Sequence, residues 1–149
     1  EDSIDPKRLV FPGLAGPYQA GAPFAYGFMR FCTGAVLVPH GIRKLMHLPP
    51  NPDGVASHGL PFPELLAWAT VFSESFAAAF LAIGFLTRFA AVTIWIEMAV
   101  IIVFYQWPFG YFWIQKGIEY PLLWLLLCTA IFFRGGGRYS IDHYLGREL

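Results

Sequence analysis

The sequence predicts an all-α integral membrane protein, a four-helix bundle of transmembrane segments with both termini on the cytoplasmic side. Of its 149 residues, 56% are apolar and only 13% are charged, whereas soluble domains carry about a quarter charged residues. Four long apolar segments, separated by short polar or turn-forming stretches, supply the helices. A length of 149 residues fits one domain.

The four predicted spans are bounded by proline, glycine or charged residues. They cover residues 24–38, 63–86, 89–107 and 118–133. Because a helix needs about 20 residues to cross a bilayer, the second and third are long enough, whereas the first and fourth must borrow flanking residues. The run Leu122–Leu127 is apolar on every side, unlike a surface helix of a soluble domain. In so small a chain, lipid must cover the outer faces of four such helices.

Positively charged residues predict the orientation. An even number of spans places both termini on one side, and that side together with the turn after the second span carries six cations: Lys7, Arg8, Arg88, Arg134, Arg138 and Arg147. The opposite side carries three: Arg43, Lys44 and Lys116. Because cytoplasmic loops are enriched in Lys and Arg, both termini are expected in the cytoplasm.

The chain divides into three predicted parts. Residues 1–22 form a polar arm rich in proline and glycine, which lacks the layout of a signal peptide. We expect this N-terminal arm to lie along the membrane or a partner subunit. Residues 23–134 form the transmembrane domain, and residues 135–149 form a cytoplasmic tail.

Three ionisable residues lie within the spans, where charges are costly and usually functional. At a rise of about 1.5 Å per residue, Arg30, Glu74 and Glu97 lie about 10, 18 and 13 Å from the cytoplasmic ends of their helices. These depths overlap, so the simple interpretation is an ion pair between Arg30 and one glutamate, with the choice left open. The second carboxyl, in low-dielectric surroundings, tends to hold its proton. Quinone chemistry or a proton relay would use such a group.

A second polar cluster is expected toward the extracytoplasmic side. His40, Arg43 and Lys44 follow the first span, and His40 and Lys44 are one helical turn apart. Glu119 opens the fourth span, where the helix dipole favours a carboxylate. The cluster is either a salt-bridged clamp between spans one and four or a polar pocket for a quinone headgroup or a small anion.

The remaining residues indicate no metal and no covalently bound cofactor. The histidines show no familiar metal spacing. Only His40 lies near a span, which argues against a haem held between two spans. The four histidines are His40, His47, His58 and His143. Cys32 and Cys128 lie far apart in apolar runs and are expected to be buried side chains. A net charge of zero, without a basic stripe, excludes nucleic-acid binding.

An aromatic loop over residues 106–117 joins the third and fourth spans. Its rings are either an anchor at the bilayer interface or the roof of an apolar ligand site.

Three motifs in order resemble the DoxX family of small four-span membrane proteins. The first is Arg30 with Gly34 and His40–Leu45, similar to the family's arginine, glycine and His-Gly-x-x-Lys-Leu pattern. The second is Glu74 with Leu81–Arg88, which resembles Leu-Gly-Leu-x-Thr-Arg. The third is Glu119 with Gly135–Asp142, which resembles Gly-Pro-Gly-x-x-Ser-Leu-Asp, with Gly136 where proline is common. The resemblance covers about residues 24–145 and does not include Glu97.

The resemblance implies a membrane subunit linked to oxidoreductases, such as a relative of a thiosulfate:quinone oxidoreductase subunit, in the inner membrane of a bacterium or archaeon. Its expected partners are the bilayer and other membrane or redox subunits. No catalytic residue is assigned, and the candidates for quinone binding or proton relay are Arg30, His40, Lys44, Glu74, Glu97 and Glu119. Because the sequence shows no cofactor motif, electrons would come from elsewhere.

Two other functions remain open. The bundle is alternatively a non-catalytic accessory subunit of a larger respiratory or photosynthetic complex, with its polar residues fixing helix register. A small transporter or channel has less support, since no internal repeat is visible.

Overall fold

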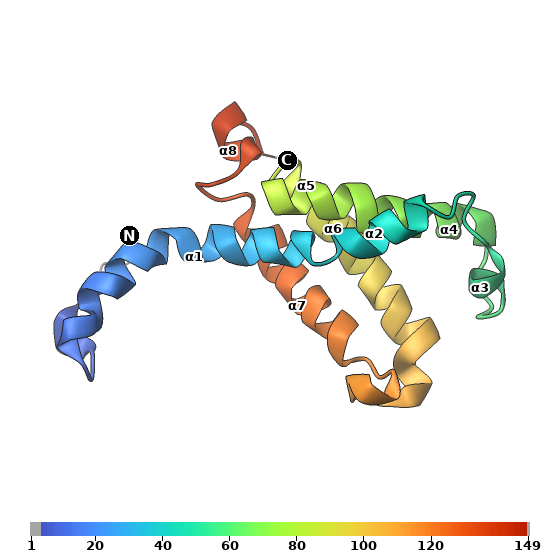
Figure 1. Cartoon of the computed structure of the whole chain (residues 1–149), viewed down its shortest axis with the longest axis horizontal. Helices are drawn as coiled ribbons and strands as arrows, with labels where there is room; N and C mark the ends of the chain where they lie inside the picture. Colours follow the sequence, from blue (N-terminus) through green and yellow to red (C-terminus); the bar gives the residue numbers. More distant parts are fainter. Residues whose placement is uncertain (1–3, 149) are drawn as a thin grey trace.

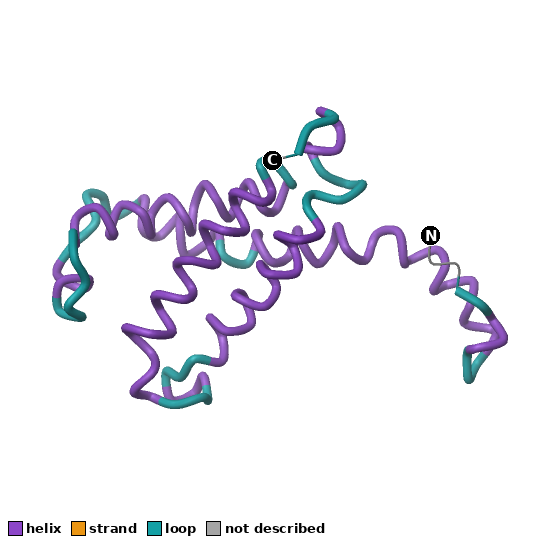
Figure 2. Tube along the Cα trace, turned by 180° about the vertical axis from the view of Figure 1, so that it is seen from behind, coloured by secondary structure: helices purple, strands orange, loops and turns teal. Residues whose placement is uncertain are grey.

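The computed structural model describes residues 4–148, and all regular structure within this range is helical. The main helices are α1 (Ala15–Ala35), α2 (Val38–Leu45), α4 (Pro63–Phe72), α5 (Ala78–Ile83), α6 (Thr87–Val100) and α7 (Glu119–Arg134). Helices α1 and α2 run nearly in line and lie beside α4 and α5, while α6 and α7 form a hairpin that leaves this layer at an angle (Figures 1 and 2). The predicted all-α class is confirmed.

Short elements complete the chain. They are α3 (Asp53–Ala56), α8 (Ile141–Leu145), 3-10 turns at Pro6–Arg8, Pro12–Leu14, Trp107–Phe109 and Trp113–Gln115, and π-helical turns at Ser73–Ala77 and Ile101–Gln106. The first π turn joins α4 to α5, and the second extends α6.

Two continuous helices within the described chain are long and apolar enough to cross a membrane, Pro63–Ile83 and Thr87–Phe109. They correspond to the second and third predicted spans. Helix α7 has 16 residues, fewer than a typical span needs, and the polar arm continues into α1. Four spans and cytoplasmic termini therefore stay predictions.

The turn between these two helices is fixed by local chemistry and by the tail. Gly84 ends α5 with φ +72°, a conformation that favours glycine. The carboxylate of Asp142 then accepts hydrogen bonds from the backbone N–H groups of Leu86 and Thr87, both at 2.8 Å. It thereby satisfies free donors at the start of α6.

Small residues bring the layers into contact. A Cβ on Gly34 of α1 would lie 2.5 Å from the backbone N of Ala82 in α5, and one on Gly41 of α2 would lie 2.5 Å from Cα of Ser75. Such close approach is characteristic of helix packing in membranes. The buried core of the molecule includes Leu81, Ile94 and Cys128, which belong to α5, α6 and α7. Cys128 is thus buried, whereas Cys32 is partly exposed.

The N-terminal part of α1 projects beyond the other helices (Figure 1). Because α1 begins at Ala15, the last eight residues of the predicted N-terminal arm belong to this helix. Upstream, the chain folds back, and the Gln19 amide donates to the carbonyl of Ile4 at 3.0 Å. Residues 1–3 of the arm and residue 149 of the tail lie outside the described range.

Candidate functional site

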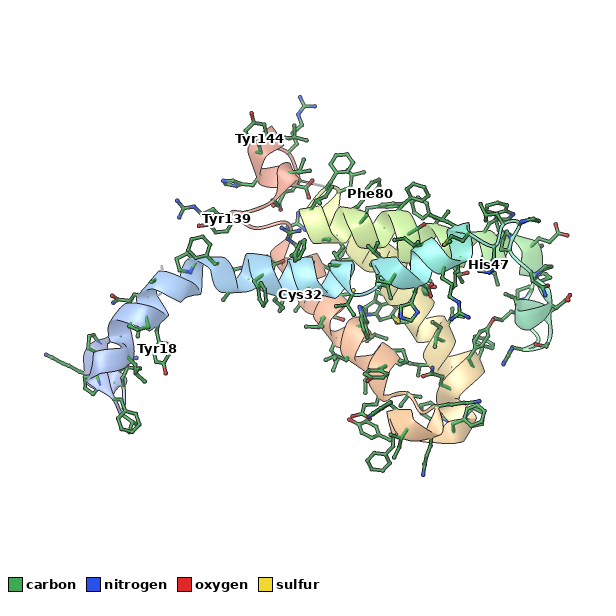
Figure 3. All side chains as sticks on the ribbon, in the orientation of Figure 1. Tyr18, Cys32, His47, Phe80, Tyr139 and Tyr144 are labelled. Atoms are coloured by element: carbon green, nitrogen blue, oxygen red, sulfur yellow. The ribbon has the colours of Figure 1, made fainter. Side chains whose placement is uncertain are left out.

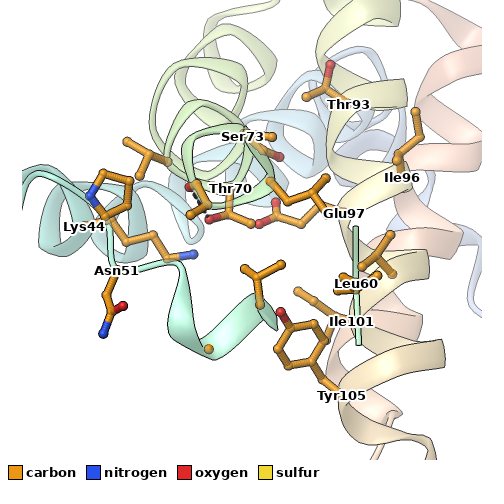
Figure 4. Close-up of a pocket in the computed structure, with 18 of the residues that line it drawn as sticks. Lys44, Asn51, Leu60, Thr70, Ser73, Thr93, Ile96, Glu97, Ile101 and Tyr105 are labelled. Carbon is orange, nitrogen blue, oxygen red and sulfur yellow. Dashed lines mark hydrogen bonds between the residues drawn. The ribbon is translucent and has the colours of Figure 1, made fainter. Parts of the chain in front are cut away.

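The segment of residues 46–62 that joins α2 to α4 is called the first loop and includes α3. A cavity of about 720 Å³ lies between this loop, α4 and α6. Most of its wall is apolar, with Leu66, Val71, Ile96 and Ile101 among the lining side chains. Figure 4 shows polar groups gathered at one end, around Ser73 and Glu97, with Lys44 directed toward them from the side. The cavity has the composition of a small-molecule site, an apolar wall with a few converging polar groups.

An ion pair stands at this polar end. The Nζ atom of Lys44 lies 2.9 Å from Oε2 of Glu74, and the Glu74 side chain is 10% exposed. Gly41 allows α2 to pack directly on the backbone of Glu74, which brings Lys44, one turn further on, to the carboxylate. Glu74 itself lies in the π turn Ser73–Ala77, and π turns within α-helices often mark functional sites.

Glu97 comes to the same place from α6. Its side chain faces Ser73 (Figure 4) and interacts with Glu74, and the residue is 8% exposed. Within the described chain, its carboxyl group has side-chain contacts to Ser73 and Glu74, but neither carboxyl oxygen makes a hydrogen bond of good geometry, and the Ser73 hydroxyl makes none either. Leaving a buried polar group poorly paired costs up to about 1–3 kcal/mol, so a ligand with polar groups would be stabilised at this end of the cavity. One ammonium group thus faces two carboxyl groups.

The structure does not pair Arg30 with either glutamate. Its guanidinium is buried and donates to four main-chain carbonyls: Leu81 (2.6 Å), Ala82 (2.6 Å), Gly136 (3.1 Å) and Tyr139 (2.6 Å). Leu81 is seven residues beyond Glu74, about 10 Å along the helix axis. The last carbonyls of a helix lack intrahelical partners, and α5 ends at Ile83. Arg30 therefore binds the end of α5 and the tail.

The expected cluster of His40, Arg43, Lys44 and Glu119 is not assembled. Lys44 pairs with Glu74, whereas a Glu119 oxygen accepts a hydrogen bond from the backbone N–H of Trp113 at 3.1 Å. His40 and Arg43 are exposed. Glu119 thus holds the aromatic loop in place, and no clamp joins the ends of α2 and α7.

The aromatic loop does not roof the cavity. The exposed rings at its centre, such as Trp107 and Phe112, are 67% and 59% exposed, and none of the rings from 107 to 113 lines the cavity. Tyr105, just before the loop, does line it, and its ring stacks on His58 of the first loop with centroids 4.0 Å apart. Sequence reasoning missed Ser73 and Tyr105, because neither is charged and their neighbours are set by the fold.

The three motifs meet in space. Lys44 of the first motif pairs with Glu74 of the second, and Arg30 joins the end of α5 to the tail, which belongs to the third. A family model described as DoxX matches residues 26–107, more than half of the chain. The chain belongs to the DoxX family.

The family match covers Arg30, Lys44, Glu74 and Glu97, and ends before Glu119 and the tail. No curated protein and no solved structure matches the chain. Membership in this membrane-associated family, together with two helices of spanning length, identifies a DoxX-family membrane protein.

Proposed function

We propose that this DoxX-family protein is a membrane subunit of an oxidoreductase system and binds a quinone headgroup in the cavity between the first loop, α4 and α6. The observation that carries the proposal is the buried carboxyl group of Glu97, whose oxygens make no hydrogen bond of good geometry within the described chain, at the polar end of an apolar cavity. A quinone presents carbonyl oxygens on an otherwise apolar ring, and its reduced form presents hydroxyl groups. The apolar wall suits the ring, and the polar end suits the oxygens.

Lys44 and Glu97 have complementary parts in this proposal. The ammonium group of Lys44 donates to a quinone carbonyl, while a protonated Glu97 donates and an ionised one accepts from a hydroxyl. Two buried carboxylates beside one cation would be costly, so a ligand hydroxyl that donates a hydrogen bond to Glu97 would offset part of this cost. Electrons are expected to come from a partner redox subunit.

The remaining sequence candidates have no part in this site. Arg30 binds carbonyls at the other end of α5, and Glu119 binds the aromatic loop. His40 is exposed on α2. The proposal therefore uses Lys44, Glu74 and Glu97.

The direct test is quinone binding by the protein purified in mild detergent. For Glu97→Leu we expect about tenfold weaker binding of a short-chain benzoquinone, because one hydrogen bond to the headgroup is lost. Glu97→Gln keeps a donor and should lose less. Glu64→Gln is the matched control, since Glu64 is exposed at the start of α4 and lies outside the cavity. Unchanged binding in Glu97→Leu would contradict the proposal.

The projecting end of α1 favours a second candidate, an accessory subunit that docks on a larger complex. Val10 and Phe11, just before α1, are 89% and 69% exposed, and Tyr18 in its first turns (labelled in Figure 3) is 47% exposed. Such a surface fits a neighbouring subunit. If Glu74→Gln leaves electron transfer of the native membrane complex unchanged and only weakens assembly, the accessory function replaces the redox one.

A further inference from the structure

Tyr105 is a polar residue of the cavity wall that the proposed quinone contacts leave unused. It lies in the π turn Ile101–Gln106, which extends α6. Its ring contacts His58, and within the described chain its hydroxyl makes no hydrogen bond. Because a phenolic hydroxyl both donates and accepts hydrogen bonds, this group is available to a polar atom inside the cavity.

The hydroxyl of Tyr105 points into the space that Glu97 faces. Tyr105 follows Glu97 by eight residues, about 12 Å along the helix axis at a rise of about 1.5 Å per residue. Side chains on a helix lean toward its N-terminus, so the Tyr105 side chain leans back toward Glu97. Figure 4 shows the hydroxyl directed into the cavity, with Glu97 on the other side of the space. One ligand between them can contact both side chains.

His58 of the first loop holds the Tyr105 ring in this direction. The two rings stack with centroids 4.0 Å apart, and His58 itself does not line the cavity. Nδ1 of His58 donates a hydrogen bond to the carbonyl oxygen of Gly54 at 2.7 Å, which ties the imidazole to α3. Because stacking restricts the rotation of both rings, the hydroxyl of Tyr105 stays directed into the cavity.

Both long helices of the cavity wall depart from α-helical geometry where they carry its polar groups. Ser73 lies in the π turn Ser73–Ala77, and Tyr105 lies in the π turn Ile101–Gln106. Both residues line the cavity. Single π turns within α-helices are frequent at functional sites. A distortion in each wall at the same cavity favours one ligand that is contacted from both sides.

We infer that Tyr105 is a further binding residue of the candidate quinone site, whose hydroxyl contacts an oxygen of the headgroup, and that His58 is its positioning residue. The inference rests on the proposed quinone function. The hydroxyl donates to a carbonyl of the oxidised ring and accepts from a hydroxyl of the reduced ring. Tyr105 therefore serves both redox states of the ligand.

The test removes the hydroxyl alone, in the full chain purified in mild detergent. Tyr105→Phe keeps the ring and its stack on His58. It should bind a short-chain benzoquinone about fivefold more weakly, because one neutral hydrogen bond is lost. The infrared C=O stretching band of the bound benzoquinone should move to higher wavenumber, since a hydrogen bond no longer weakens the carbonyl bond. A merely structural effect would not move this band.

The matched control is Tyr111→Phe, since Tyr111 is 53% exposed in the aromatic loop and lies outside the cavity. It should leave the affinity and the infrared band unchanged. His58→Ala should weaken binding and broaden the band, because the Tyr105 ring loses its stack. His58→Phe keeps an aromatic ring at this position and should restore most of the binding.

The outcomes separate this inference from the function on which it rests. If Glu97→Leu weakens binding whereas Tyr105→Phe changes neither the affinity nor the band, the quinone function stands and the inference about Tyr105 is wrong. Equal changes in Tyr105→Phe and Tyr111→Phe would also overturn it. If the unmodified protein binds no benzoquinone, the proposed function fails, and the binding role of Tyr105 fails with it.

Discussion

Arg30 is the residue on which the terminal side of the molecule depends, because it joins α1, the end of α5 and the tail through carbonyl oxygens. Arg30→Gln would leave most of these buried acceptors unpaired, at about 1–3 kcal/mol each before relaxation. We expect a marked fall in the thermal unfolding midpoint in detergent.

Arg134→Gln is the control, since Arg134 is exposed and its guanidinium lies 5.2 Å from the centroid of the Tyr26 ring. A cation–π contact of this kind contributes about 1 kcal/mol. Equal falls in the two variants would show that the carbonyl contacts do not hold this end together.

At this scale the sequence predicts which residues matter better than which residues meet. A charge inside an apolar run is recognisable from neighbours in the chain, and Arg30, Glu74 and Glu97 stand out for that reason. Their partners depend on where α5 ends and where the tail returns, and neither follows from depth along a single helix. Arg30 therefore donates to main-chain carbonyls and not to a glutamate, and Lys44 forms an ion pair with Glu74 and not with Glu119.

Helix α2 is the element that completes the candidate site, and Gly41 is the reason it fits. A Cβ at this position would lie 2.5 Å from Cα of Ser75, so Gly41→Ala must push α2 away from the π turn. Overpacking of this kind costs about 1–3 kcal/mol, and it separates Lys44 from Glu74. We expect lower thermal stability and weaker benzoquinone binding. Gly16→Ala is the matched control, because its Cβ would meet no atom within 4 Å and alanine favours a helix. If the two variants behave alike, the close packing of α2 is not needed.

Helix ends at proline were predictable, and helix distortions were not. The second span was expected from residue 63, and α4 begins at Pro63, because proline suits the first turn of a helix. The π turn at Ser73–Ala77 left no such signal. It depends on the packing of α2 and α6 around Glu74, as does the place of Ser73 at the cavity.

The whole molecule separates two kinds of polar chemistry along one helix pair. Toward the first loop, a lysine and two glutamates surround the end of an apolar cavity. Toward the termini, an arginine, an aspartate and main-chain carbonyls fix the turn and the tail. The sequence predicts overlapping depths for Arg30, Glu74 and Glu97, because the position at which a helix starts does not show how far a long side chain reaches. The candidate ligand site therefore lies at one end of the helix pair, and the contacts that hold the turn and the tail lie at the other.

The orientation of these two ends in the membrane can be tested with single cysteines. With Cys32 and Cys128 replaced by alanine, Ser57→Cys reports on the exposed first loop, and Tyr144→Cys reports on the tail, where Tyr144 is 89% exposed. The excess of Lys and Arg on the terminal side predicts that this side is cytoplasmic. A membrane-impermeant maleimide added to intact cells, with the outer membrane permeabilised where present, should label Ser57→Cys and spare Tyr144→Cys until the membrane is opened. The reverse pattern would place the candidate quinone cavity in the cytoplasmic half, and labelling of both from outside would require an even number of spans between these positions, in place of the three predicted.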